Sequence, residues 1–192
     1  MEFKDLLKKN AEEVNNILET FLPKNIDANW LNKHVGASSY DVGAVNEFLT
    51  KPVWDFLERG GKRWRPLLMF LSCEAVGGNA KNFSEFAVIP ELIHNGTLIV
   101  DDVEDGSAMR RGKTAINISY GADIAINVGN LLCYLPLLVI KNSNINSERK
   151  LKIYELVNEE MLKLHVGQGS DIYWHKIKNE NVSEQQYFAM CA

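Results

Sequence analysis

Three carboxylates gathered at the end of an apolar segment predict a metal site. Asp101, Asp102 and Asp105 lie in the stretch ELIHNGTLIVDDVEDGSAMRRGK, which runs from Glu91 to Lys113. On a helix, Asp101 and Asp105 share a face, while Asp102 lies about 100° round the axis. Such a pair suits Mg²⁺, which takes one or two protein carboxylates and fills its other positions with water and substrate phosphates. We therefore expect Asp101 and Asp105 to be Mg²⁺ ligands.

The simpler interpretation of the acidic residues is a solvated helix end, because runs of charge usually face water. Carboxylates near a helix C-terminus are disfavoured by the macrodipole, and a bound cation would offset that cost. The neighbouring cations favour the metal site.

Two basic turns accompany the acidic segment. Arg110 and Arg111 follow Asp105 closely, and the stretch RGGKRWRP at residues 59–66 places four cations around a glycine pair. The planar guanidinium of arginine binds phosphate oxygens through two parallel hydrogen bonds. Each turn alone could simply be solvated, but the combination predicts two diphosphates, one held through metal and one held directly by cations.

Three further residues of the same segment could face this site. His94 lies seven residues before Asp101, on the same helical face, and could donate to a phosphate or be an ordinary core histidine. Gly96 and Thr97 are small, so they would leave space one turn below the metal; alternatively, they are helix-packing residues.

A second polar group interrupts a later apolar helix. Gln168 and Asp171 are three residues apart in HVGQGSDIYW and therefore share a face. Polar residues in an apolar helix are costly unless paired, so they form either a buried hydrogen-bonded pair or part of a site.

The composition is that of an ordinary globular protein. The chain has 192 residues, of which 46% are hydrophobic, and its net charge of -4 argues against nucleic-acid binding. The cysteines, which are scattered and odd in number, indicate a reducing compartment, so we expect a cytoplasmic protein. The longest apolar run, residues 131–140, is too short to span a bilayer, and we expect no transmembrane segment.

The hydrophobic pattern predicts an all-α fold. Apolar residues recur at helical spacing, with breaks at Pro23, Gly60-Gly61 and Gly106. Ser84 is the expected N-cap of the helix that carries the acidic residues, unless Pro90 marks its start. The expected helices cover residues 4–22, 44–58, 66–76, 84–105, 116–141 and 147–173, and residues 110–114 are expected to form a loop. Ser183 and Gln186 form a capping box for one more helix, in which the chain stops. We expect residues 1–192 to be a single domain that is the front part of a longer one.

Taken together, these motifs resemble the trans-isoprenyl diphosphate synthases, and among them the geranylgeranyl diphosphate synthases most. The matching elements are GGKRWRP at 60–66 (motif GGKRxRP), DDVED at 101–105 (motif DDxxD), RRGK at 110–113, His94 with Leu98 (Thr97 replaces the usual serine), and Gln168 with Asp171 (motif GQxxD). The order and spacing agree from about residue 44 onward.

The resemblance implies a helical bundle around a central cavity, usually dimeric, that condenses isopentenyl diphosphate with an allylic diphosphate such as geranyl or farnesyl diphosphate. It implies that Asp101, Asp102, Asp105 and Arg110 are catalytic, with Mg²⁺ on Asp101 and Asp105. The substrate-binding residues that it implies are Lys62, Arg65, His94, Arg110, Arg111, Gln168 and Asp171.

Pocket depth should set the length of the product. Burying a further five-carbon unit gains roughly 4 kcal/mol, at about 0.8 kcal/mol per carbon, so elongation should continue until a side chain blocks it. Because Gly96 and Thr97 are small, we expect geranylgeranyl diphosphate or a longer product, with Ile93 one turn deeper as a candidate floor. Replacing Gly96 by phenylalanine should then shorten the product.

The family's second aspartate-rich motif is not found in these residues. We expect a fragment of an enzyme; the alternative is a non-catalytic or heteromeric subunit that binds prenyl diphosphates. A terpene cyclase would share DDxxD but has no need of GGKRWRP, which serves isopentenyl diphosphate.

Overall fold

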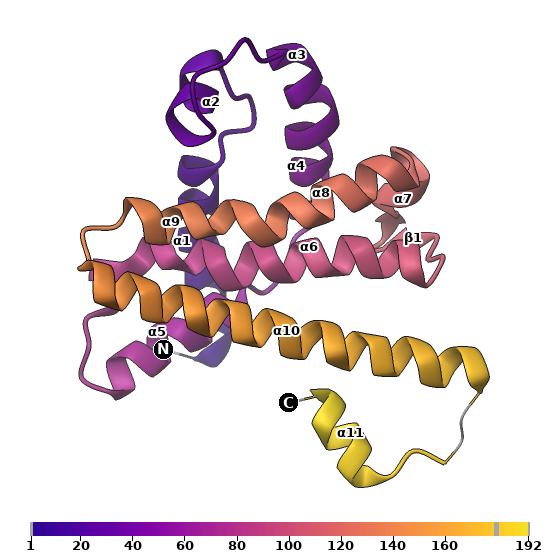
Figure 1. Cartoon of the computed structure of the whole chain (residues 1–192). Helices are drawn as coiled ribbons and strands as arrows, with labels where there is room; N and C mark the ends of the chain where they lie inside the picture. The colour runs from indigo at the N-terminus through magenta and orange to yellow at the C-terminus, as the bar shows by residue number, and fades with distance from the viewer. Residues whose placement is uncertain (1, 179–180, 192) are drawn as a thin grey trace. The chain divides into compact units, whose positions relative to one another are not determined.

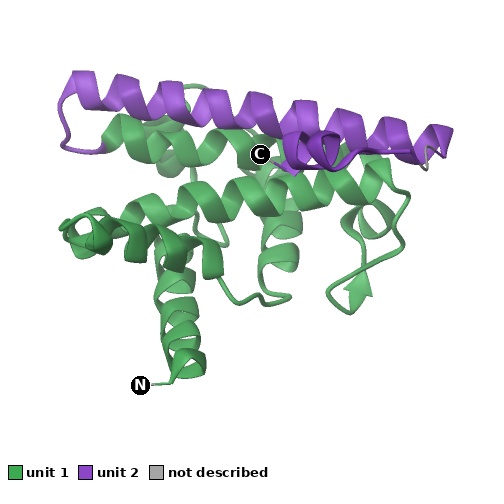
Figure 2. Cartoon of the chain, turned by 90° about the horizontal axis from the view of Figure 1, so that it is seen from below, with its two compact units in different colours: residues 1–142 green, residues 143–192 purple. Residues whose placement is uncertain are grey.

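The computed structural model describes residues 2–178 and 181–191 as helices joined by short connections and one small hairpin (Figure 1). This confirms the all-α prediction. The chain divides into two compact units, residues 1–142 and residues 143–192 (Figure 2).

The first unit contains α1 to α9. Their bounds are α1 Phe3–Phe21, α2 Ala28–His34, α3 Val42–Val45, α4 Lys51–Leu57, α5 Trp64–Ala75, α6 Val88–Glu104, α7 Ile116–Ser119, α8 Ala122–Tyr134 and α9 Leu138–Asn142. A π-helical turn, Asn46–Thr50, joins α3 to α4, and 3-10 turns cover Ala80–Ala87 and Leu135–Leu137. The hairpin pairs β1 Met109–Arg110 with β2 Lys113–Thr114.

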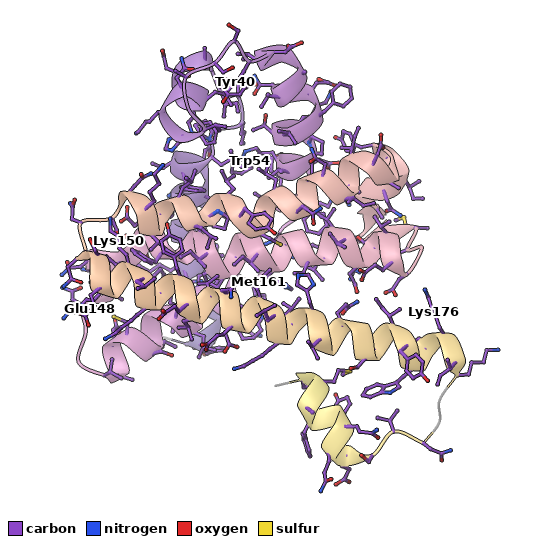
Figure 3. The ribbon with its side chains drawn as sticks, in the orientation of Figure 1. Tyr40, Trp54, Glu148, Lys150, Met161 and Lys176 are labelled. Atoms are coloured by element: carbon purple, nitrogen blue, oxygen red, sulfur yellow. The ribbon has the colours of Figure 1, made fainter. Side chains whose placement is uncertain are left out.

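The helix α1 buries one apolar stripe against the rest of the first unit. Val14 and Leu18 are essentially inaccessible, and α1 packs against α5, α6 and the 3-10 turn before α6. The labelled Trp54 of α4 donates from Nε1 to the carbonyl oxygen of Leu22 at 3.2 Å, which fastens α4 to the end of α1 (Figure 3). The helix therefore belongs to the core of this unit.

The pair α6 and α8 forms the centre of the first unit, and the two helices run side by side (Figure 1). Leu92 and Ile99 of α6, with Val128 and Leu132 of α8, have no or almost no exposed surface. Close approach is permitted by Gly96 and Gly129. A Cβ on Gly96 would lie 2.7 Å from the carbonyl oxygen of Gly129 and 2.8 Å from Cβ of Leu132.

Residues 122–142, covering α8 to α9, are long and apolar enough to cross a membrane by length and composition, with mean hydropathy 1.7. The core helix of a soluble protein has the same properties, and Val128 and Leu132 pack in the core of the first unit.

The start of α6 corrects one prediction. Ser84 is not the N-cap of this helix, because residues 80–87 form a 3-10 turn that is capped by Asn79. The helix begins at Val88, which puts Pro90 in its first turn, where the missing N–H costs no intrahelical bond. Its end agrees with the prediction: Asp105 is the C-cap and Gly106 follows with φ +63°.

The second unit contains α10 Ser147–Ile177 and α11 Glu184–Cys191. The side chain of Asn146 caps α10 through the amide of Arg149 at 2.9 Å. The capping box at the start of α11 is confirmed: the Ser183 amide donates to Gln186 Oε1 at 2.9 Å, and the Gln186 amide donates to Ser183 Oγ at 3.2 Å. At Gly167, an added Cβ would collide with the backbone of Met190, so α10 and α11 meet closely there.

Candidate functional site

The acidic end of α6 is tied to the hairpin by Arg110. Its guanidinium lies 2.6 Å from Asp102 Oδ1 and 3.1 Å from Asp101 Oδ2. The hydrogen bond to Asp102, followed by charge attraction to both carboxylates, raises the pKa of Arg110. One arginine therefore holds two of the three predicted aspartates.

Asp102 points into the protein rather than toward solvent. Its side chain has no exposed surface, and Oδ2 has no hydrogen-bond partner within the described residues. The side-chain amide of Asn117 donates to its carbonyl oxygen at 3.3 Å. This burial agrees with the position of Asp102 about 100° away from the other two aspartates on the helix.

The other two aspartates reach the surface, although Asp101 is also bonded to Arg110. The side chain of Asp101 is 31% exposed, and Asp105 is exposed at the C-cap of α6. Among the described residues, no group of three or more acidic, histidine or cysteine side chains is arranged to hold a metal ion. Two carboxylate groups of this kind fit Mg²⁺ when the remaining ligands are water and phosphate oxygens.

The two basic turns, which are about 50 residues apart in sequence, are in contact. The Arg111 Nη1 group donates to the carbonyl oxygen of Gly60 at 2.8 Å, and the Arg59 Nη1 group donates to the carbonyl oxygen of Arg110 at 3.4 Å. Both Arg59 and Lys113 also reach Asp55 of α4. These bonds bring the cations of the sequence motifs to one place.

Residues 110–114 form a tight hairpin, whereas the sequence predicted a loop. Met109 pairs with Thr114 and Arg110 with Lys113, and the turn consists of Arg111 at φ +51° and Gly112 at φ +76°. Two-residue hairpins of this kind require positive φ at both turn positions. A side chain other than Asn, Asp or Gly is unfavourable there, so the pattern gave no hairpin signal.

Three of the predicted substrate-binding residues form an electropositive group. Burial, and then the nearby charge of Arg65, lowers the pKa of His94 to about 4, with Arg111 and Arg110 adding to the effect and Glu91 opposing it. Burial also lowers the pKa values of Arg65 and Arg111. His94 is therefore neutral at physiological pH and is surrounded by positive charge.

Glu91 offsets part of the charge of Arg65 and Arg111 but is itself ion-paired with Arg63. Within the described part of the chain, no carboxylate forms an ion pair with Lys62, Arg65 or Arg111. Lys62 is exposed, and the guanidinium of Arg65 lies over the ring of Trp64, 4.5 Å from its centroid. Partly buried cations without counterions favour an anionic ligand.

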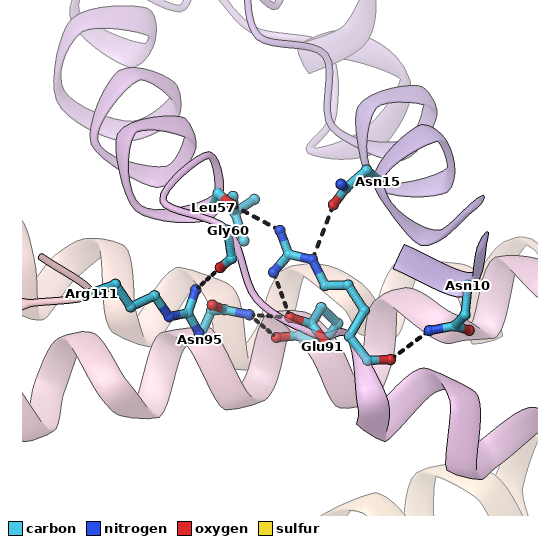
Figure 4. Close-up of polar contacts among 8 residues, drawn as sticks. Asn10, Asn15, Leu57, Gly60, Glu91, Asn95 and Arg111 are labelled. Atoms are coloured by element: carbon cyan, nitrogen blue, oxygen red, sulfur yellow. Dashed lines mark hydrogen bonds and ion pairs between the residues drawn. The ribbon is translucent and has the colours of Figure 1, made fainter. Parts of the chain in front are cut away.

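Arg63, in contrast, is directed into the core. Its side chain is 3% exposed and forms a 2.7 Å ion pair with Glu91 of α6 (Figure 4). The sequence grouped Arg63 with the solvent-facing cations of RGGKRWRP. Contacts with distant residues distinguish it, among them Glu91 on the buried face of α6 and Asn15 of α1.

The residues predicted to set product length have different environments. Gly96 faces α8, so the helix-packing alternative holds, and the interpretation of Gly96 as open space in a pocket is wrong. Thr97 is half-buried and bonds through Oγ1 to the carbonyl oxygen of His94 at 2.9 Å. Ile93 is also half-buried, and the role of both side chains in chain length stays a prediction.

Gln168 and Asp171 lie on α10 in the second unit. Both are half-buried, and Asp171 Oδ2 is 3.2 Å from Nδ1 of His175 one turn later. Their predicted role at the metal is not tested by these contacts.

The structure also contains a cavity of about 210 Å³ beside α1. It lies between α1, α5 and the 3-10 turn, with Leu6, Leu67 and Phe70 in its wall. None of the predicted site residues lines it.

Fold and site together define an all-α protein with an acidic helix end and a cluster of cations beside it. Solved structures share this fold. A geranylgeranyl pyrophosphate synthetase from Geoglobus acetivorans superposes with a TM-score of 0.80 at 25% identity, covering 96% of this chain and 54% of that one. The corresponding enzyme from Pyrococcus horikoshii gives 0.78 at 27% identity, covering 99% of this chain and 53% of that one.

The polyprenyl synthetase family model matches residues 46–192, and the chain belongs to this family. A geranylgeranyl diphosphate synthase of Methanosarcina mazei is 32% identical over 161 residues, covering 83% of this chain and 49% of the relative. A geranylgeranyl pyrophosphate synthase of Metarhizium robertsii is 30% identical over 182 residues, covering 94% of this chain and 50% of the relative. The chain thus spans about half the length of these relatives.

Proposed function

We propose that the chain carries one half of the active site of a trans-prenyltransferase. This enzyme would condense isopentenyl diphosphate with an allylic diphosphate, geranyl or farnesyl diphosphate, to give geranylgeranyl diphosphate or a longer product. The proposal rests on the position of Arg110. It forms ion pairs with Asp101 and Asp102 at the acidic end of α6 and, with Arg65 and Arg111, contributes to the positive charge that lowers the pKa of His94. Membership of the polyprenyl synthetase family and the names of the relatives support it.

The acidic side of the site would bind the allylic diphosphate. Asp101 and Asp105 would hold Mg²⁺, which, when bound, neutralises the charge of the diphosphate leaving group. Arg110 has donors beyond those used by the two aspartates and would bind a phosphate oxygen directly. Asp102 is buried against Arg110, so it would act by orienting this arginine. Gln168 and Asp171 would face the metal through water.

The basic side would bind isopentenyl diphosphate through Lys62, Arg65, Arg111 and His94. Because His94 has a pKa of about 4, it would donate a neutral N–H to a phosphate oxygen rather than add a further positive charge. Separate anion sites for the two substrates would hold the isopentenyl double bond close to the allylic carbon, which lowers the entropic cost of the reaction. The proton released after bond formation could pass to the departing diphosphate, so no protein base is needed.

Steady-state turnover of labelled isopentenyl diphosphate with farnesyl diphosphate and Mg²⁺ tests the proposal. We expect elongation that Asp101→Ala abolishes and that Glu104→Ala, which changes a neighbouring carboxylate without a proposed role, leaves within a few-fold. Elongation that survives Asp101→Ala undiminished would rule out the proposed metal site.

A second candidate is a prenyl-diphosphate-binding subunit without activity of its own, acting in a homodimer or a heteromer in the cytoplasm. The specific observation in its favour is that the described residues contain no group of three or more acidic, histidine or cysteine side chains arranged to hold a metal ion. Mg²⁺-dependent binding of farnesyl diphosphate without turnover would identify this function.

A further inference from the structure

The loop of residues 58–63 connects α4 to α5. Polar side chains of α1 and α6 form hydrogen bonds with Arg63 at the end of this loop. We propose that Asn10 and Asn15 of α1 are positioning residues for the isopentenyl diphosphate site, because they fix Arg63 between Lys62 and Arg65. The inference rests on the proposed function for the identity of the ligand. It assigns a role at the site to the N-terminal helix, which lies outside the residues 46–192 matched by the family model.

Arg63, which Figure 4 draws without a label, is bonded to the labelled residues Asn10, Asn15, Leu57 and Glu91. Its Nε donates to Asn15 Oδ1 at 3.0 Å, its Nη1 to Glu91 Oε1 at 2.7 Å, and its Nη2 to the carbonyl oxygen of Leu57 at 2.8 Å. Its own carbonyl oxygen accepts from Asn10 Nδ2 at 2.7 Å. Arg63 is thus bonded to α1 through both its backbone and its side chain, and to α4 and α6 through its side chain.

These hydrogen bonds matter because the backbone of the loop has unusual conformational freedom. Gly60 and Gly61 have φ of +87° and +151°, and Arg63 itself has φ +49° at the N-cap of α5. Glycine loses more conformational freedom on ordering than other residues do, and the left-handed region is unfavourable for arginine. The bonds to Asn10, Asn15 and Glu91 therefore select one of many loop conformations.

The adjacent residues then take their positions from Arg63. Lys62 precedes it and is exposed, while Arg65 is in the first turn of α5 and has a pKa lowered by burial. The other end of the loop is held by Arg111, which donates to the carbonyl oxygen of Gly60. The two proposed phosphate-binding side chains are thereby set relative to Arg111.

Asn10 makes its contact with Arg63 from a buried position. The residue is 5% exposed, and its Oδ1 has no partner among the described residues. A leucine here would remove the unpaired oxygen but would also take a donor from the carbonyl oxygen of Arg63, which would keep only the bond from the Leu67 amide at 3.3 Å. The hydrogen bond from Nδ2 to the Arg63 carbonyl oxygen is therefore the contact that asparagine makes here and leucine cannot make.

The test uses the full chain and three leucine variants: Asn10→Leu, Asn15→Leu and, as the matched control on the same helix, Asn16→Leu. Asn15 and Asn16 are both exposed, but of the two only Asn15 hydrogen-bonds to Arg63 in the described part of the chain. The conservative variant Asn15→Asp keeps an oxygen acceptor for Arg63. Binding of isopentenyl diphosphate, and of farnesyl diphosphate with Mg²⁺, is measured by calorimetry beside the melting temperature.

We expect the first two variants to bind isopentenyl diphosphate roughly two- to tenfold more weakly, the range that one net hydrogen bond accounts for. Farnesyl diphosphate binding should change less than twofold, and Asn15→Asp should keep the wild-type affinity for isopentenyl diphosphate. Equal weakening of both ligands, or unchanged affinity for isopentenyl diphosphate in folded Asn10→Leu and Asn15→Leu, overturns the inference.

Hydrogen exchange of the free protein separates this inference from the proposed function. We expect Asn10→Leu and Asn15→Leu to speed exchange of the amides of residues 60–65, with those of α8 unchanged. If the wild-type chain binds neither diphosphate, the proposed function fails, and faster exchange still supports the positioning role. Unchanged exchange at residues 60–65 contradicts that role whether or not the diphosphates bind.

Discussion

Replacing Gly96 by alanine should destabilise the first unit, although alanine is the better helix former. The new Cβ would lie 2.7 Å from the carbonyl oxygen of Gly129 and 2.8 Å from Cβ of Leu132, well inside the usual contact distance of about 3.5–4.0 Å. One of these atoms is backbone, so α6 and α8 must separate. Overpacking costs about 1–3 kcal/mol, and we take the upper end here. The gain in helix propensity of about 1 kcal/mol leaves a net loss of about 1–2 kcal/mol.

The assay is thermal unfolding followed by circular dichroism, with Gly169→Ala as the control. Gly169 lies within α10 and has open space where its Cβ would be, so the same substitution should stabilise by up to about 1 kcal/mol. For Gly96→Ala, the expected fall in melting temperature is about 2–8 °C. Phenylalanine at this position should prevent the unit from folding, so a shortened product cannot be read from it.

A rise in melting temperature for Gly96→Ala, similar to that of Gly169→Ala, would refute the reasoning. It would mean that α6 and α8 are not in tight contact at Gly129. Folded, active Gly96→Phe with a shorter product would refute it more strongly, because Gly96 would then face the product pocket.

Three other predictions concern the charged residues. Arg63→Met should lower the free energy of unfolding by about 3–5 kcal/mol, because it leaves Glu91 buried without its cation, and adding Glu91→Leu should recover most of the loss in a denaturant titration. Asp102→Asn should cost about 1.5–3 kcal/mol in the same titration through the lost charged contact with Arg110, and no loss would show that this pair is not formed. Because the pKa of His94 falls to about 4 on folding, the unfolded chain binds more protons, and stability should decrease as the pH falls from about 6.5 to about 4. His94→Asn should make this decrease smaller, which unfolding at pH 7 and pH 4.5 would show.

Local signals predicted the positions of the longer helices, but they missed α2 and the breaks within residues 116–141. The apolar period of residues 4–22 and the capping box at Ser183 are properties of neighbouring residues, and both are confirmed in the structure. The N-cap predicted at Ser84 was wrong for a local reason. Residues 80–87 form a 3-10 turn, and a serine inside such a turn looks like an N-cap in the sequence.

Contacts between distant segments could not be predicted. The hairpin at residues 110–114 needs positive φ at Arg111, which its bond to the Gly60 carbonyl favours from 51 residues away. The burial of Arg63 depends on Glu91 and on Asn15, and nothing in the RGGKRWRP stretch distinguishes this arginine from its neighbours.

By itself, the sequence determined the all-α class, the family resemblance and the residue types of the proposed diphosphate site, because these depend on side-chain chemistry and helical period. The tertiary structure decided the direction of each side chain. It turned Asp102 and Arg63 inward, left Asp101 and Arg65 partly open, and placed Gly96 against α8. The physical reason is that burial and pairing depend on which helices pack together, and that choice is made by the whole core rather than by any one motif.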